Sequence, residues 1–387
     1  GFRQRDVFAL STDGSRKSTL VRGPGHDRLL GWLPDGGGVL LHRQRDDARD
    51  IWILPVREGK PAGEAEPLKK DVWQLSPFGF AKDAYYYGVA AESRQVHTVS
   101  VDLSTGRAMG TPEPVGNRSD GPSNYGTWSP DGARFAYLLD LPGFRHAFLV
   151  VESADGETLR EMPVFLSQAR RLRWTDRGLL LYGIDAEGTE GVFRMDSASG
   201  ELVPQITVTP GEADGLGLFE TARDGRIVYF VPGSELVALD LATHERRVVR
   251  DGVHRLGGVS PDGEWVVFLH GSGDDRRLAV ARADGTGVAR DIYRFEETRG
   301  TWGNQGSIPW TPDGRHVLLA EFSRPDSGVD VLRIPVDGEG DPELLLTTAP
   351  GSGAQLQVSP DGRLISFTAG QPKHEIWRLT GWATGGP

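Results

Sequence analysis

A short turn motif recurs along the chain and constrains the fold more than any other feature. Its clear copies have the form Trp/Val-x-Pro-Asp-Gly, and each is followed by a short apolar run; they lie at residues 32–36, 128–132, 259–263, 310–314 and 358–362. Proline presets φ at the first corner of a turn, aspartate bonds back to its own backbone, and glycine accepts positive φ. Each copy therefore predicts a tight turn that leads into a β-strand.

Degenerate copies of the motif lie between the clear ones, at residues 80–83, 174–178 and 221–225. With the turn aspartate as the marker, the copies fall at Asp35, Asp83, Asp131, Asp176, Asp224, Asp262, Asp313 and Asp361. The steps between successive markers range from 38 to 51 residues. A period of this length predicts a repeat architecture.

A second apolar strand pattern follows each turn, as at residues 51–54 and 147–150, and a further Asp-Gly turn and short strand usually come after it. Four short strands per repeat are typical of a propeller blade. We therefore predict an all-β fold, a β-propeller of four-stranded antiparallel blades. The eight turn copies predict eight blades, with seven as the alternative.

The strand patterns at the two ends of the chain predict how the ring of blades closes. Strands are expected at residues 6–10 and 18–22, while the last repeat, which begins near Gln355, shows only three strands. We expect residues 1–24 to complete the C-terminal blade, since closure removes exposed sheet edges. One strand is then surplus, because residues 7–10 and 376–379 compete for the same place. Residues 1–387 are accordingly predicted to form a single domain, with blades over 25–380 and a tail over 381–387.

These features carry a family resemblance. The Ser-Pro-Asp-Gly turn, the aromatic-rich strand after it and the later Ile-Trp strand resemble the WD40-like (PD40) repeats of the TolB-type propeller family, found in bacteria. The resemblance covers essentially the whole chain and implies the propeller fold. Because that family includes binding scaffolds, sensor domains and propellers attached to peptidases, fold alone does not choose a function.

Composition excludes several classes of function. The net charge of −11 argues against nucleic-acid binding, which depends on Lys and Arg. The chain has no Cys, which excludes disulfides and thiolate chemistry. No apolar run approaches the ~20 residues of a membrane helix. We expect a soluble protein without a cofactor, and we favour a periplasmic or other extracytoplasmic location over the cytoplasm.

The turns of the motif are short and alike, whereas the connections at the other end of the blades are long and mutually different. Variable loops on a rigid scaffold usually carry binding, so a peptide, protein or small-molecule ligand is predicted on the long-loop face. The candidate residues precede the innermost strands, at the mouth of the central channel, or lie in the long connection 291–309; they are His26, Gln74, Tyr125, Arg170, Asp214, His254, Trp302, Asn304, Gln305 and Gln355. The alternative is a water-filled channel with a polar lining.

A basic cluster precedes Trp174. Arg170, Arg171 and Arg173 together suit a carboxylate or phosphate held by forked hydrogen bonds. Alternation along a strand would separate Arg170 from Arg171, so ordinary surface charge is the favoured interpretation. Trp32, Trp128, Trp174 and Trp310 are interpreted as blade-packing aromatics.

Signatures of enzymes and metal sites are mostly absent. No Gly-x-Ser-x-Gly elbow occurs, and His26 and His254 have no third ligand at a meaningful spacing, so no metal site is predicted. The interpretation is a non-catalytic binding propeller, a sensor or scaffold module that is free-standing or part of a larger protein. The alternative is a small-molecule lyase or hydrolase at the channel mouth, with His26 and His254 as acid and base.

Overall fold

The computed structural model describes residues 6–23, 26–45, 48–70, 72, 75–91, 94–116, 121–141, 146–208, 216–295, 300–301, 307–322, 328–349, 354–370 and 373–381. They form two compact units, unit 1 within residues 1–92 and 372–387 and unit 2 within residues 93–371. In the described residues regular structure is almost entirely β-strand, and the two helices, η1 (Leu216–Leu218) and η2 (Gly273–Asp275), are single 3₁₀ turns. The all-β prediction is confirmed.

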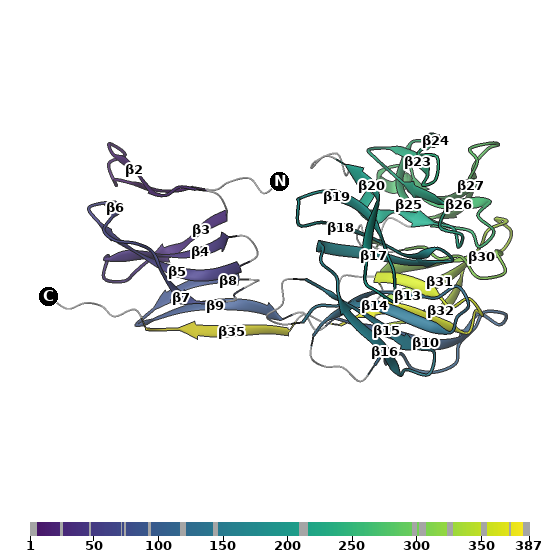
Figure 1. Cartoon of the computed structure of the whole chain (residues 1–387), viewed down its shortest axis with the longest axis horizontal. Helices are drawn as coiled ribbons and strands as arrows, with labels where there is room; N and C mark the ends of the chain where they lie inside the picture. Colours follow the sequence, from purple (N-terminus) through teal and green to yellow (C-terminus); the bar gives the residue numbers. More distant parts are fainter. Residues whose placement is uncertain are drawn as a thin grey trace. The chain divides into compact units, whose positions relative to one another are not determined.

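Unit 2 is built from six antiparallel sheets in its described residues, which we call blades 1 to 6 (Figure 1). Blade 1 contains β13 (Ser123–Trp128), β14 (Arg134–Leu139), β15 (Phe148–Ser153) and β16 (Thr158–Pro163). Blade 2 contains β17 (Ser167–Thr175), β18 (Gly178–Ile184), β19 (Glu190–Met195) and β20 (Leu202–Val208). Blade 3 contains β21 (Glu220–Thr221), β22 (Ile227–Phe230), β23 (Glu235–Asp240) and β24 (Arg246–Asp251).

The remaining blades of unit 2 continue this order until the last one. Blade 4 contains β25 (Val253–Val259), β26 (Trp265–His270), β27 (Arg277–Arg282) and β28 (Arg290–Arg294). Blade 5 contains β29 (Gly300–Thr301), β30 (His316–Phe322), β31 (Val329–Pro335) and β32 (Glu343–Thr347). Blade 6 combines β33 (Ala354–Val358) and β34 (Leu364–Ala369) with β10 (Gln95–Asp102), on which β11 (Arg107–Ala108) and β12 (Glu113–Pro114) pair.

The recurrent turn has the geometry that its residues predict. Gly132 has φ +72°, and its N–H donates to the Ser129 carbonyl at 2.8 Å. The Ser129 hydroxyl donates to Asp131 Oδ1 at 2.6 Å and accepts the Arg134 N–H at 2.8 Å. The equivalent glycines also have positive φ, and they are Gly36, Gly263, Gly314 and Gly362. The predicted tight turns are therefore confirmed.

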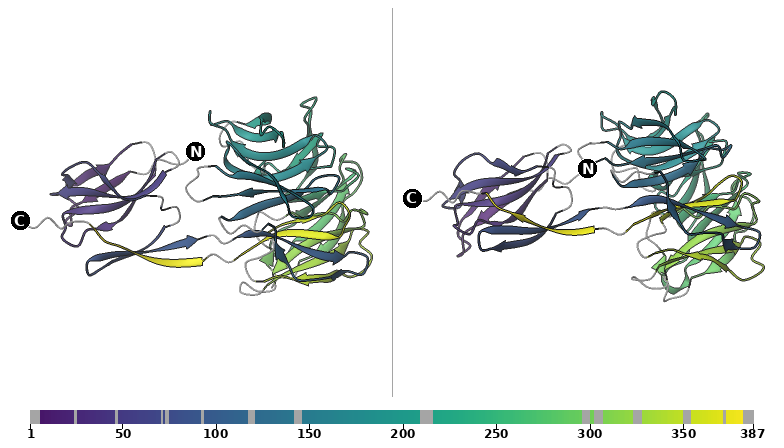
Figure 2. Two further views of the ribbon diagram at one scale, coloured as in Figure 1. Left: turned by 60° about the horizontal axis from the view of Figure 1, so that its bottom comes forward. Right: turned by 90° about the horizontal axis from the view of Figure 1, so that it is seen from below.

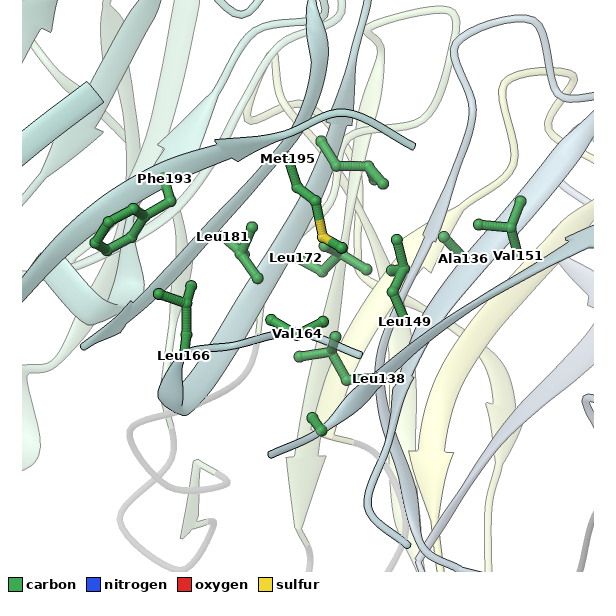
Figure 3. Close-up of a cluster of buried hydrophobic side chains, with 12 residues drawn as sticks. Ala136, Leu138, Leu149, Val151, Val164, Leu166, Leu172, Leu181, Phe193 and Met195 are labelled. Atoms are coloured by element: carbon green, nitrogen blue, oxygen red, sulfur yellow. The ribbon is translucent and has the colours of Figure 1, made fainter. Parts of the chain in front are cut away.

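Apolar side chains fill the space between successive blades. Between blades 1 and 2, Leu138, Leu149 and Val164 pack with Leu172 and Leu181, and Figure 3 shows these side chains pointing toward one another. Comparable clusters join blades 2 and 3, 3 and 4, 4 and 5, and 5 and 6. A further cluster joins blade 6 to blade 1, since Val96 of β10 packs with Trp128 and Phe135. The six blades are thus in cyclic contact.

The predicted closure by residues 1–24 is wrong. β2 (Lys17–Val21) pairs with β1 (Val7–Leu10), and β35 (Lys373–Leu379) pairs with β9 (Ala84–Ala91). The last repeat is instead completed by β10, which lies beside β34 (Figure 2). Pairing between segments far apart in sequence is set by packing, which the local turn and strand signals do not contain. Eight blades in one ring are not confirmed.

Unit 1 contains the strands from both ends of the chain. A sheet of β3 (His26–Trp32), β4 (Gly38–Arg45) and β5 (Ala48–Arg57) carries β6 (Lys60–Pro61) and β7 (Glu66–Lys69) on β5. A three-stranded sheet has the order β35, β9 and β8 (Leu75–Ala81), and Figure 1 shows β35 in yellow beside β9 in blue. The single domain over residues 1–387 stays a prediction, because the two units are described separately.

Candidate functional site

A cavity of about 310 Å³ lies at the centre of unit 2. Every blade contributes to its lining, through Thr127, Arg173, Glu220, Gly258, Ser307 and Gln357 among others. Prolines of four recurrent turns also line it, and they are Pro130, Pro261, Pro312 and Pro360. The cavity therefore opens at the turn end of the innermost strands, opposite to the long-loop end.

A buried ionic network forms one wall of the cavity. Arg173 makes a forked contact with Glu220, with Nε to Oε2 at 2.7 Å and Nη2 to Oε1 at 2.6 Å. The Nη2 group also donates to Ser307 Oγ at 2.7 Å. Arg171 donates to the same glutamate and, at 3.0 Å, to the Phe219 carbonyl. This network links blades 2, 3 and 5 across the centre of the unit.

Among the described residues, Arg171, Arg173 and Arg255 all act on the carboxylate of Glu220. Burial lowers the pKa of Arg171 to about 9 and that of Arg255 to about 10, and the negative charge of Glu220 partly opposes this lowering. Both guanidinium groups therefore stay protonated at pH 7. Burial raises the pKa of Glu220, but the charges of Arg171 and Arg173 outweigh it and leave the pKa below its ordinary value. In the described part of the chain, Glu220 is therefore ionised under the influence of three guanidinium groups.

An irregular innermost strand places these arginines. The register of β17 shifts between Arg170 and Arg173, and Arg171 has φ +59°. Arg171 and Arg173 are only 2% and 8% exposed, whereas Arg170 lies with its guanidinium 4.5 Å from the centre of the Tyr182 ring. The expected separation of Arg170 from Arg171 is confirmed, but the interpretation of Arg171 and Arg173 as surface charge is wrong.

Two tryptophan side chains in the cavity wall have unused donors. Trp128 and Trp310 are buried, and neither indole N–H has a hydrogen-bond partner among the described residues. Their burial agrees with the interpretation as packing aromatics. Trp174 also lines the cavity, whereas Trp32 in unit 1 is 46% exposed.

Four of the ten predicted site residues have described side chains, and two of those four are in contact. Gln355 Oε1 accepts the Tyr125 N–H at 2.8 Å, Arg170 packs on Tyr182, and His254 is exposed in β25. The backbone of His26 lies in β3 of unit 1. The other five lie outside the described residues, and they are Gln74, Asp214, Trp302, Asn304 and Gln305. The long-loop site stays a prediction, and among the described residues none of the predicted ten lines the cavity.

Sequence reasoning missed Glu220, Ser307 and Gln357. The sequence did contain a signal for Glu220, because Glu220 follows Arg173 by 47 residues, the length of one repeat. Residues one repeat apart occupy similar places in neighbouring blades. A comparison of the residues just before each recurrent turn, from one repeat to the next, would have indicated which residues line the cavity.

The described residues contain no group of three or more His, Cys, Asp or Glu side chains that could hold a metal ion. A search of the same residues for a helix that is long and apolar enough to cross a membrane found none.

Comparisons with known proteins bear on the fold. No family model matches the sequence, and no curated protein matches it. A solved structure of TolB from Agrobacterium tumefaciens is 17% identical, covers 73% of this chain and 100% of its own, and has a TM-score of 0.54. TolB from Acinetobacter baumannii is 14% identical over 89% of this chain and 82% of its own, with a TM-score of 0.46.

An oligogalacturonate lyase from Vibrio parahaemolyticus is also 14% identical, over 76% of this chain and 77% of its own, with a TM-score of 0.43. At these identities the likeness concerns the fold alone, and only the first structure is similar enough to carry an argument. It supports a TolB-like β-propeller fold for this chain, together with the six sheets of unit 2.

Proposed function

We propose that unit 2 is a non-catalytic binding propeller whose ligand enters the central cavity from the turn end. The observation that carries this proposal is the cavity itself, which all six blades line and which combines an ionic network with aromatic and proline walls. Binding sites for small ligands are typically concave, largely apolar and furnished with a few placed polar groups. The cavity is concave, holds a few placed polar groups and has tryptophan and proline side chains in its wall.

The polar groups of the cavity are held in place without a ligand. Arg173 is fixed by Glu220 and Ser307, and the Thr127 hydroxyl accepts the backbone N–H of Trp174 at 3.2 Å. A site whose side chains are already ordered loses little conformational entropy on binding. We propose a small molecule or the end of a peptide as the ligand. A sensor or scaffold role in a larger protein, and an extracytoplasmic location, remain part of this proposal.

A pair of variants tests where ligands bind. Ala222 lines the cavity, so Ala222→Trp should fill it, whereas Ala133→Trp adds the same side chain to an exposed alanine of another turn. The measurement is ligand-detected magnetic resonance with a library of small acids, amides and tripeptides. Compounds that bind the wild type should bind Ala133→Trp and fail to bind Ala222→Trp. A library without any binder, or binders that Ala222→Trp retains, would contradict the proposal.

The lyase or hydrolase alternative depends on His26 and His254. His26 belongs to unit 1 and His254 to unit 2, and His254 is exposed. No observation in the described residues favours these two side chains as an acid and base pair. The binding function is therefore the one that the geometry supports best.

A further inference from the structure

The three-stranded sheet of unit 1 ends at β35, which has no further strand beside it among the described residues (Figure 1). β8, β9 and β35 have the places of the first, second and third strands of a blade. Blades 1 to 5 each have a fourth strand, and so does the sheet of β3, β4 and β5, where β7 pairs with β5. β35 is therefore a third strand with an open edge, and such an edge is a template for pairing with another strand.

The pairing of β35 has the regularity of an interior strand. Its seven residues pair with β9 without a shift of register, as do the second and third strands of blades 1 to 5. The outermost strands differ, because every third-to-fourth pair in those blades, and the pair of β5 and β7, contains a register shift. Such irregularities protect sheet edges against pairing with another chain. β35 lacks this protection.

Two large apolar side chains of β35 are exposed at positions where other third strands are buried. Ile376 is 72% exposed and Trp377 is 43% exposed, whereas β15, β27 and β31 each contain four successive buried residues. Successive side chains of a strand point to opposite faces of the sheet, so each face of the open edge presents one of the two. A strand beside β35 would therefore cover apolar surface on both faces.

The surroundings of these two side chains extend the apolar surface on each face. Ile376 lies opposite Gly88 of β9, and the ring of Phe78, which is itself exposed, covers that glycine. On the other face, Trp377 lies opposite the buried Tyr87, and its indole N–H donates to Glu375 Oε2 at 2.9 Å. The strand thus carries apolar contacts and a tryptophan–carboxylate pair at its centre.

The side chains of β35 are compatible with a second β35. In an antiparallel pair related by a two-fold axis at Ile376, the Ile376 side chains of the two strands lie opposite each other. Glu375 then lies opposite Trp377 of the second strand, on the other face. Directly opposite residues are the cross-strand neighbours that stabilise a sheet, and the hydrogen bond between Trp377 and Glu375 within one strand shows that these two groups suit each other.

We propose that the open edge of β35 pairs antiparallel with β35 of a second copy of this chain, centred on Ile376. Each copy lacks the same neighbour and supplies it to the other, which joins two three-stranded sheets into one continuous sheet. A two-fold dimer of this kind is the commonest form of homo-oligomer. The interface lies on unit 1 and is independent of the ligand binding proposed for unit 2.

Sedimentation velocity of the full chain over a wide range of concentration tests this proposal. The mass of the wild type should rise with concentration from that of one chain to that of two. Ile376→Lys places two like charges opposite each other, which is destabilising, and should keep the chain monomeric. The matched control is Val288→Lys, the same change at a 92% exposed residue between β27 and β28. This control should dimerise as the wild type does.

A mixture of two charge variants tests the register. Ile376→Glu alone should also be monomeric, but Ile376→Glu mixed with Ile376→Lys should dimerise, because opposite charges then face each other across the two-fold axis. Thermal unfolding checks that both variants fold. A measurement on the wild type alone avoids substitution altogether: backbone amides of β35 should exchange hydrogen more slowly at the highest protein concentration than at the lowest.

Three results would overturn the proposal. A wild type that keeps the mass of one chain at every concentration would show that a second copy does not occupy this edge and would leave it to a different partner. A dimer that Ile376→Lys retains, or that forms without slower exchange in β35, would use another surface. Folded lysine and glutamate variants that stay monomeric when mixed would reject the pairing about Ile376.

Discussion

Gln355 and Tyr125 are 230 residues apart, yet the Gln355 side chain accepts the Tyr125 backbone N–H at 2.8 Å. This bond joins β33 of blade 6 to β13 of blade 1. Both residues have positive φ, +63° and +58°, and both lie where their strands are irregular. The Gln355 oxygen also accepts the Thr368 hydroxyl at 2.9 Å. A single buried amide thus satisfies two donors where the last blade meets the first.

Loss of this amide should weaken the closure of unit 2. Gln355→Ala leaves the Tyr125 N–H and the Thr368 hydroxyl without their acceptor, and we expect it to lower the free energy of unfolding by about 1–3 kcal/mol. Denaturant unfolding measures the loss. The matched control is Gln357→Ala, two residues along the same strand, whose amide lies at 3.5 Å from Ser307 Oγ. Equal stability of the two variants would show that the Gln355 contact does not hold the blades together.

The recurrent turns should depend on glycine at one position. Gly132 has φ +72°, a conformation in which a β-branched residue is strained. We expect Gly132→Val to destabilise the protein by about 1–3 kcal/mol, and Gly132→Asn to cost less because asparagine tolerates this region. Thermal unfolding is the measurement. An unchanged midpoint for the valine variant, or a lower midpoint for asparagine than for valine, would contradict the backbone explanation.

Acid should weaken the ionic network of the cavity. The folded pKa of Glu220 lies below the ordinary 4.5, so its ionised form stabilises the fold fully above that value. This stabilisation is lost as the pH falls through the lower, folded pKa. Glu220→Gln removes the negative charge that Arg171 and Arg173 share and should cost about 3–5 kcal/mol at neutral pH.

The difference in unfolding free energy between wild type and Glu220→Gln should therefore shrink as the solution is acidified. Denaturant titrations from neutral pH down to about pH 3 measure it. A difference that stays constant over this range would mean that Glu220 is not the ionised partner of Arg171 and Arg173.

The turns and strands could be predicted from the sequence because their causes are local. Ser129, Asp131 and Gly132 act within a few residues of one another, and the turn that they make is the one observed. The closure could not be predicted in the same way. β34 pairs with β10. Neither strand carries a local signal for this partner, because many apolar strands could pair with it, and the packing of side chains between blades selects one.

The candidate site was predicted in part for the same reason. Arg171 and Arg173 were recognised as a cluster, but alternation along a strand gave no indication that both would be buried. That outcome depends on the register shift in β17 and on Glu220 in the next blade. Both are consequences of packing between blades. The repeat period alone would have connected Arg173 with Glu220.

The central claim is that ligands bind in the cavity at the turn end of unit 2. Fluorine magnetic resonance of protein that carries 5-fluorotryptophan at its ten tryptophans tests it directly, with each resonance assigned by a Trp→Phe variant. On addition of a compound of the small acid, amide and tripeptide library that the wild type binds, the resonances of Trp128, Trp174 and Trp310, which line the cavity, should shift, while that of Trp265 stays in place. A shift of Trp265 with the three cavity resonances unchanged would contradict the claim.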